Sequence, residues 1–164
     1  MRISVVQGSI LEANAQAIVN AANSLGIMGG GVAGVIKRAA GSEVEAEARK
    51  QAPILVGKAV LTSGGRTSFK GIIHAPTMPQ PAMSIPAKNV ALATKAALTL
   101  ADAQGFTSIA IPGMGTGVGG VVHAEAAKLM VGEIKAYAAR ALQSVILVDV
   151  DQAMVNAWQD AMRG

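Results

Sequence analysis

Cysteine is absent from this sequence of 164 residues, and histidine and aromatic residues are rare. Without cysteine the chain has no disulfide, no thiolate nucleophile and no thiolate metal site. Aromatic residues make up 2% of the sequence, which argues against a single-strand nucleic-acid platform, because such platforms stack bases on aromatic rings. The two histidines have few other metal ligands around them, so we expect no bound metal.

Long apolar runs are also missing, although hydrophobic types make up 51% of the chain. No run approaches the roughly 20 residues needed to span a bilayer, and the segment Met1–Gly8 has the pattern of a strand and not of a signal peptide. The length fits one domain over residues 1–164. We therefore expect a single cytoplasmic domain with no membrane association, no cofactor and no obligate partner.

Charge of one sign is not concentrated anywhere in the chain. The net charge is +4, but the basic residues are scattered. This balance suits an anionic ligand and gives only weak support for nucleic-acid binding. Glycine is what the chain has in excess, with 19 residues that gather mainly in two places.

Short continuous apolar runs alternate with stretches of helical period, which is typical of strands buried on both faces between helices. An α/β fold is therefore predicted. The predicted strands are Ile3–Gln7, Ala17–Asn20, Ala59–Ser63, Ile72–Ala75, Ser108–Pro112 and Ser144–Val150.

Several helices carry recognisable end signals. Ser42 and Glu45 have the spacing of a capping box, which predicts a helix start. Apolar residues recur at helical spacing over Val90–Ala101, and Gly105 then predicts the end of that helix.

Two more helices and one loop are predicted from the sequence after residue 75. The pattern predicts a helix over His123–Leu142 and another that ends at Met162 with Asp151 as its N-cap. Four prolines between Pro76 and Pro86 predict a surface loop there.

The first candidate site is a run of three glycines, Gly29, Gly30 and Gly31, which follows a predicted strand and precedes a helical pattern. Residues without a Cβ let backbone N–H groups approach a ligand closely, and a helix N-terminus adds partial positive charge. The run therefore predicts an anion cradle. The alternative is a tight strand-to-helix turn without a ligand.

The second candidate site follows the strand at residues 108–112. Gly115, Gly117 and Gly120 match G-x-G-x-x-G, so a dinucleotide-binding Rossmann turn is an alternative. The acidic residue expected about 20 positions later is missing, because Asp149 lies well beyond that point. Two glycine cradles on one sheet suit a diphosphate, since each can hold one phosphoryl group.

The order and wording of these motifs resemble one family, the macrodomains, which bind ADP-ribose. The resemblance covers nearly the whole chain and is carried by Gln7–Ile10, Asn20–Ser24, Gly29–Gly34, Ile72–Ala75 and Ser108–Gly117. It implies a three-layer α/β/α sandwich with a mixed, mostly parallel central sheet. It also implies a cleft at the strand ends that holds ADP-ribose between the two glycine loops.

The resemblance also implies which residues contact the ligand. Macrodomains commonly have an Asp that accepts a hydrogen bond from the adenine amino group, and Ser9 stands at that position. Aromatic rings of the family look replaced by Val150 and Gly119, so we expect weak, micromolar binding. The expected contact residues are Ser9, Ile10, Ala21, Asn23, Gly29, Gly30, Gly31, Val32, Gly115, Thr116, Gly117, Val118, Gly119 and Val150.

Catalysis is predicted to depend on Asn23, which resembles the asparagine that contacts the distal ribose in the family. Many macrodomain hydrolases carry an Asp where this chain has Ala33; viral macrodomains that lack it still hydrolyse ADP-ribosyl esters. A second hydrolase group uses a Lys and an Asp at positions that look like Thr62 and Gly119 or Gly120 here. Since neither loop holds a general base, we predict substrate-assisted hydrolysis, with a water between phosphate and distal ribose attacking the anomeric carbon.

Each of these polar residues also has a structural interpretation. Asn23 can cap a turn, and Asn20 is assigned mainly to that turn. His74 and His123 are expected to be structural, and Asp149 and Asp151 are interpreted as strand-end and cap residues.

Three functions therefore remain open at this point. The first is an ADP-ribose-binding domain that removes ADP-ribose from modified macromolecules, as a mono-ADP-ribosylhydrolase or an O-acetyl-ADP-ribose deacetylase. The second is a non-catalytic reader of ADP-ribosylated protein or nucleic acid. The third is a nicotinamide-cofactor oxidoreductase built on the loop at Gly115.

Overall fold

The computed structural model describes the whole chain, Met1–Gly164. Its strands are β1 (Arg2–Gln7), β2 (Ala17–Asn23), β3 (Val60–Thr62), β4 (Gly71–Met78), β5 (Ser108–Ile111) and β6 (Ser144–Asp149). Its helices are α1 (Gly31–Ala40), α2 (Ser42–Lys50), α3 (Lys88–Ala103), α4 (His123–Ala136) and α5 (Gln152–Arg163), with a short 3-10 helix η1 (Ile10–Glu12). None of the helices combines the length and the apolar character needed to cross a lipid bilayer.

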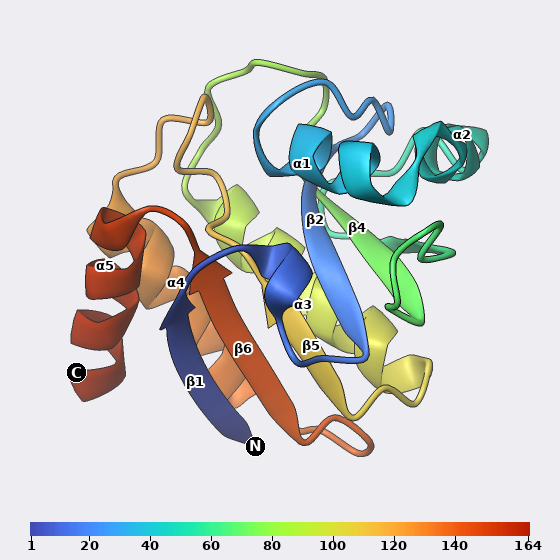
Figure 1. Ribbon diagram of the computed structural model, residues 1–164. Coiled ribbons are helices and arrows are strands. Elements are labelled where there is room, and N and C mark those ends of the chain that lie inside the picture. The colour runs from blue at the N-terminus through green and yellow to red at the C-terminus, as the bar shows by residue number, and fades with distance from the viewer.

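The strands form one mixed sheet in the order β1-β6-β5-β2-β4-β3 (Figure 1). All neighbours pair in parallel except β3, which pairs antiparallel with β4 at one edge. The carboxyl ends of five strands therefore meet along the same edge of the sheet. In open α/β sheets this edge is where ligands bind.

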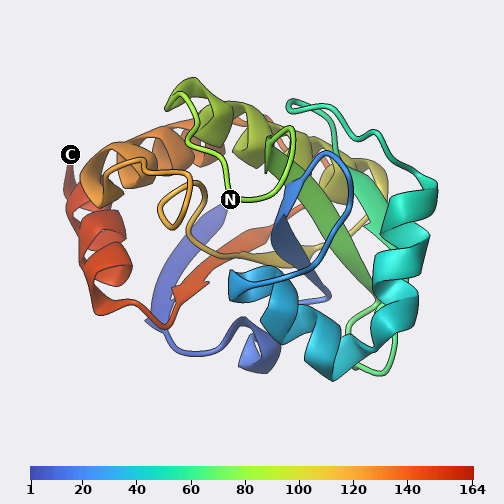
Figure 2. The same ribbon diagram turned by 90° about the horizontal axis from the view of Figure 1, so that it is seen from above.

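Helices cover both faces of the sheet, which confirms the predicted three-layer sandwich. Alternate strand residues point to opposite faces, so Val19 and Ile73 pack in the larger core with α3, α4 and α5. Ile18 and Ile72 pack in the smaller core with α1, α2 and η1. Figure 2 shows α3 and α4 on one side of the sheet and α1 and η1 on the other.

The predicted loop over Pro76–Pro86 is wrong at its start. β4 continues to Met78, and Pro76 pairs with Ala22 of β2. Proline lacks a ladder donor, and here it lies beside a shift of register between Ala22 and Asn23. The irregular segment therefore begins only after Met78.

Two helix predictions are also corrected. α4 ends at Ala136 and not at Leu142, because the Asp102 carboxylate accepts the backbone N–H groups of Arg140, Ala141 and Leu142. These bonds from outside the segment hold it in an irregular conformation. They also lower the pKa of Asp102 to about 2, with the bond from Leu142 contributing most.

The capping box at Ser42 and Glu45 does not form. Gly41 is the N-cap of α2, and no side chain caps it. Glu45 instead bonds residues outside its own helix. The last helix is as predicted, since the Asp151 side chain accepts from the backbone N–H of Ala153 as the N-cap of α5.

Candidate ligand-binding cleft

A cleft of about 780 Å³ lies at the carboxyl ends of the strands. Its walls come from the ends of β2, β4 and β6, from the segments that directly follow β1 and β5, from the start of α1 and from the loops between them. The volume is within the range of about 300–1,000 Å³ that is usual for small-molecule sites. Every predicted contact residue except Thr116 lines it, so the two glycine loops share one crevice.

The first glycine loop ends in a helix, as the sequence predicts. Gly30 is the N-cap of α1 and no side chain caps it. The backbone N–H groups from Gly29 to Ala33 donate to no acceptor in the protein. A helix start with free N–H groups carries a partial positive charge and is a ready anion site.

Glu45 holds the beginning of this loop in place. Its carboxylate accepts the backbone N–H of Met28 at 2.6 Å and the Lys37 ammonium at 2.9 Å. Burial works against ionisation, but the bonds from Lys37 and Met28 outweigh it and lower the pKa of Glu45 below 4.5. The carboxylate therefore stays charged at neutral pH and clamps α2 to the glycine run.

The second glycine loop joins a strand to a helix, as the sequence predicts. β5 ends at Ile111 and α4 begins only at His123. A Rossmann turn leads directly into its helix, so the G-x-G-x-x-G spacing does not mark one here. The loop holds its own shape through bonds from Gly120 to Gly117 and from Val121 to Gly115.

The amides of this second loop are free nonetheless. The backbone N–H groups from Met114 to Gly119 donate to no acceptor in the protein. Two glycines keep the loop compact, since Gly115 has φ +74° and a Cβ on Gly119 would lie 2.6 Å from the Gly115 carbonyl oxygen. A row of free N–H groups in a glycine loop is an anion-binding arrangement.

Asp149 is the one ionisable side chain in the lining of the cleft, where no Lys or Arg is found. It is the last residue of β6, and its carboxylate accepts the backbone N–H groups of Gly113 and Asp151, both at 3.0 Å. The sequence alone predicts only a strand-end role for Asp149. A signal for its place in the cleft is nevertheless present in the sequence. Asp149 stands at the end of a predicted strand, and the carboxyl ends of parallel strands meet at the edge of the sheet where ligands bind.

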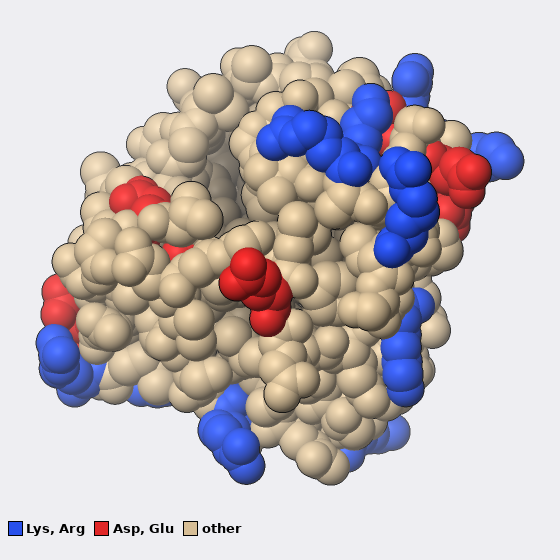
Figure 3. Space-filling model, in the orientation of Figure 1, with Lys and Arg blue, Asp and Glu red and all other residues tan.

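The charged residues of the molecule lie mostly outside the cleft. Figure 3 shows Lys and Arg gathered over α1 and α2, which contain Lys37, Arg38, Arg49 and Lys50. An anion in the cleft would therefore be held by backbone dipoles and not by basic side chains.

Asn23 lines the cleft but is already engaged in the turn that follows β2. Its Oδ1 accepts from the backbone N–H groups of Leu25 and Ile27, and its Nδ2 donates to the Ile27 carbonyl at 2.8 Å. An amide nitrogen carries two N–H bonds, so one remains free. Asn23 therefore caps a turn and still offers one donor.

Asn20 lies in β2 and not in the predicted turn. It is buried, and its Nδ2 bonds Nδ1 of His74 at 3.1 Å, while Thr62 Oγ1 bonds Nε2 at 2.9 Å. Desolvation by burial lowers the pKa of His74 to about 4. Thr62 and His74 are thus parts of a buried polar network and do not line the cleft.

His123 lies at the start of α4 and pairs with Asp151 at the surface, 2.8 Å apart. The prediction that it has a structural role fits this contact. No three metal-binding side chains gather anywhere in the structure.

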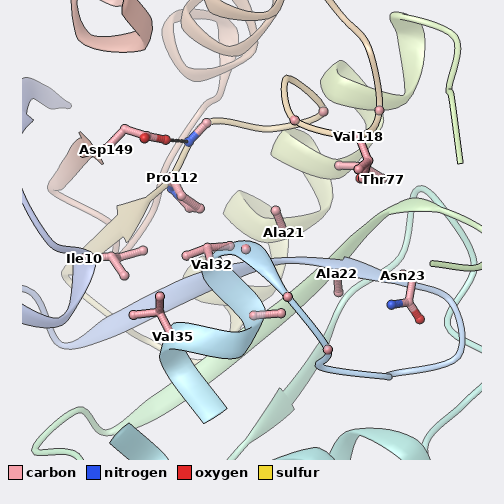
Figure 4. Close-up of a pocket in the computed structure, with 18 of the residues that line it drawn as sticks. Ile10, Ala21, Ala22, Asn23, Val32, Val35, Thr77, Pro112, Val118 and Asp149 are labelled. Carbon is pink, nitrogen blue, oxygen red and sulfur yellow. Dashed lines mark hydrogen bonds between the residues drawn. The ribbon is translucent and has the colours of Figure 1, made fainter. Parts of the chain in front are cut away.

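The cleft has two chemically different ends (Figure 4). Ile10, Pro112 and Val32 gather with Asp149 in one half of the view, and Asn23 lies in the other. At the first end, Ile10 is buried and Val150 is 71% exposed at the rim. Ser9 lies there too, with its Oγ accepting from the backbone N–H of Leu11 to cap η1.

Comparison with known proteins gives one consistent result. The family model of the Macro domain matches residues 19–130. An uncharacterized protein of Aquifex aeolicus is 57% identical over 99% of this chain and 98% of its own length. A Salmonella gallinarum protein named O-acetyl-ADP-ribose deacetylase is 37% identical over 85% of this chain and 80% of its own.

Solved structures agree with the sequence relatives. The macrodomain of Oceanobacillus iheyensis with ADP superposes with a TM-score of 0.86 at 26% identity, covering 97% of this chain and 88% of that one. A mutant of the same macrodomain with ADPR gives a TM-score of 0.86 at 25% identity, over 97% of this chain and 90% of that one.

Proposed function

The chain belongs to the macrodomain family, and from this premise we propose that its cleft binds ADP-ribose. The observation that carries the proposal is the pair of free amide rows, Gly29–Ala33 and Met114–Gly119, on one cleft. They follow β2 and β5, which are neighbours in the sheet. A pyrophosphate between them would accept hydrogen bonds from both loops.

The rest of the ligand would extend to either side of the pyrophosphate. Adenine would lie at the apolar end beside Ile10, and the distal ribose would lie near Asn23. Val150 directly follows Asp149 in the lining and would also lie at the adenine end. The aliphatic side chain of Val150 cannot stack on adenine as an aromatic ring does, which supports micromolar and not nanomolar affinity.

Calorimetric titration with ADP-ribose, ADP, AMP and NAD tests this proposal. We expect ADP-ribose to bind with a micromolar Kd, ADP to retain much of that affinity, and AMP to bind far more weakly because it offers one phosphoryl group to two loops. A preference for NAD over ADP-ribose would instead support the oxidoreductase alternative. Absence of ADP-ribose binding would reject the proposal.

We further propose that the domain hydrolyses ADP-ribosyl esters, which the 37% identity to the Salmonella protein named O-acetyl-ADP-ribose deacetylase supports. For a glutamyl-ADP-ribose substrate, a water held between phosphate and distal ribose attacks the anomeric carbon. The bond from that carbon to the acyl oxygen breaks, the carboxylate leaves with the electron pair, and a phosphate oxygen takes the proton from the water. The free N–H of Asn23 would orient the distal ribose or this water.

Two variants at position 23 test whether Asn23 takes part in the reaction. Asn23→Asp keeps an oxygen that accepts from Leu25 and Ile27, but it replaces Nδ2, which donates to the Ile27 carbonyl and carries the free donor, with a second oxygen. Asn23→Ala removes all of these groups. We expect both variants to lose turnover of a glutamyl-ADP-ribosylated protein. We also expect both to lose thermal stability, Asn23→Asp because its second oxygen would face the Ile27 carbonyl oxygen. Turnover that survives in both would remove Asn23 from the reaction. Binding without turnover in the unsubstituted protein would leave the reader alternative.

A further inference from the structure

We infer that Asp149 reads the adenine base by accepting a hydrogen bond from its amino group. The inference rests on the proposed function, since it presupposes an adenine nucleotide in the cleft. Asp149 lines that cleft at the carboxyl end of β6 and carries its one ionisable side chain.

The negative charge of Asp149 determines which chemical groups of a ligand can lie next to it. No Lys or Arg lines the cleft, and Asp149 forms no ion pair in the structure. An uncompensated carboxylate repels phosphate and attracts hydrogen-bond donors. At neutral pH the pyrophosphate of ADP-ribose has no donor, so it must lie away from this end, and the groups that remain are the amino group and the ribose hydroxyls.

The order of the strands sets the distance between Asp149 and the two glycine loops. In the order β6-β5-β2, the two glycine loops follow β5 and β2 and Asp149 ends β6. Adjacent strands are about 4.8 Å apart, so Asp149 lies about 10 Å from the β2 end along the sheet edge. A base attached through a ribose to a pyrophosphate held over β5 and β2 therefore reaches the end of β6.

The surroundings of Asp149 suit a flat base. Ile10 and Pro112 supply apolar surface at this end of the cleft, and Val150 follows Asp149 directly in the lining. Each Asp149 oxygen accepts one backbone N–H, and a carboxylate has about four acceptor positions. Acceptor capacity therefore remains for a ligand. It belongs to a carboxylate, which accepts more strongly than the neutral Ser9 hydroxyl that caps η1.

The test compares ADP with purine riboside 5′-diphosphate, which has a hydrogen in place of the amino group and is otherwise the same. The unsubstituted protein is expected to bind ADP about tenfold more tightly, the size expected for a hydrogen bond to a charged group. In Asp149→Ala the two nucleotides are expected to bind about equally. A ratio is measured because a merely structural role of Asp149, in holding Gly113, would weaken both nucleotides alike.

Asp151→Ala is the matched control. Asp151 lies two residues away and carries the same charge, but it does not line the cleft. Its substitution removes the N-cap of α5 and the contact with His123, so we expect lower thermal stability with the ratio unchanged.

The outcomes are distinct. Equal binding of both nucleotides by the unsubstituted protein overturns the inference, and so does a tenfold ratio that persists in Asp149→Ala or disappears in Asp151→Ala. The first measurement holds even where Asp149→Ala fails to fold. If neither ADP nor ADP-ribose binds the unsubstituted protein, the proposed function itself fails, and the inference fails with it.

Discussion

The glycines around the cleft differ in whether the backbone leaves space for a side chain. Gly117 is exposed and has no atom within 4 Å of the place where a Cβ would lie, whereas Gly119 has a carbonyl oxygen at 2.6 Å. The backbone at Gly117 can thus accept a side chain, although a side chain there would stand among the free amides. A substitution of Gly117 can therefore affect ligand binding without affecting folding.

Gly117→Glu should abolish ADP-ribose binding while leaving the fold intact. The new side chain would place bulk and negative charge where a phosphate is expected to lie. Gly132→Glu is the matched control, because Gly132 is exposed in α4, is equally open and lies outside the cleft. Titration and a thermal melt of both variants make the comparison. Retained binding in Gly117→Glu would show that this loop does not hold the phosphate.

His74 is a residue whose protonation should change stability and not ligand recognition. Thr62 donates to the Ser63 carbonyl, so its oxygen accepts from His74 Nε2–H, and His74 Nδ1 accepts from Asn20. Both ring nitrogens are therefore satisfied when the ring is neutral. A second ring proton would face the Asn20 amide donor.

The free energy of unfolding should consequently fall as the pH falls below 6.5. The folded pKa of His74 is about 4 against 6.5 in the unfolded chain, so the unfolded state takes up a proton first, and stability is lost between pH 6.5 and 4. From pH 7 to pH 5 the loss is about 2 kcal/mol. His74→Gln should lack this loss in urea unfolding at the two pH values; an equal slope in both proteins would contradict the assignment.

At the scale of elements, contacts between distant segments decide where helices and loops begin. Glu45 of α2 bonds Met28, which directly precedes the first glycine loop, and Lys37 of α1. The clamp thus links both helices to the row of free amides without touching a ligand. It acts as a positioning contact for the loop.

Glu45→Ala is expected to weaken ADP-ribose binding by about threefold to tenfold and to lower stability by about 1 kcal/mol, because a buried N–H loses a charged acceptor. Glu43→Ala is the control, since Glu43 is exposed on the same helix. The lowered pKa of Glu45 keeps the clamp charged above pH 4.5 and weakens it as the pH falls further. Unchanged affinity in Glu45→Ala would mean that the loop holds its shape without the clamp.

These long-range contacts also explain what the sequence could and could not predict. The strands followed from continuous apolar runs, and the start of α5 followed from Asp151, because those signals are local. The end of α4 and the false capping box did not, because Asp102 and Glu45 act on residues far away in the chain. The contact of Asp149 with Gly113 is not predicted either, because the two residues lie 36 positions apart, although the place of Asp149 at a strand end is a local signal.

Across the whole molecule, the positive net charge does not come from residues of the candidate site. The chain has a net charge of +4, yet the cleft is lined by one carboxylate and no basic residue. The Lys and Arg side chains over α1 and α2 lie at the surface in Figure 3. They can raise the rate at which an anion approaches, but they are not among the residues that line the site.

The affinity for ADP-ribose should therefore depend little on salt. Charges in water are screened over about 10 Å at 0.1 M ionic strength and over about 3 Å at 1 M, whereas short hydrogen bonds from backbone amides in a cleft are screened far less. We expect Kd to change by about threefold or less between 50 and 500 mM sodium chloride in calorimetric titrations. The association rate, measured by stopped flow, should fall more than the affinity does, because steering by the surface cations is screened first. A Kd that rises tenfold or more over this range would mean that basic side chains contact the phosphates directly, which requires a rearrangement that brings Lys or Arg into the cleft.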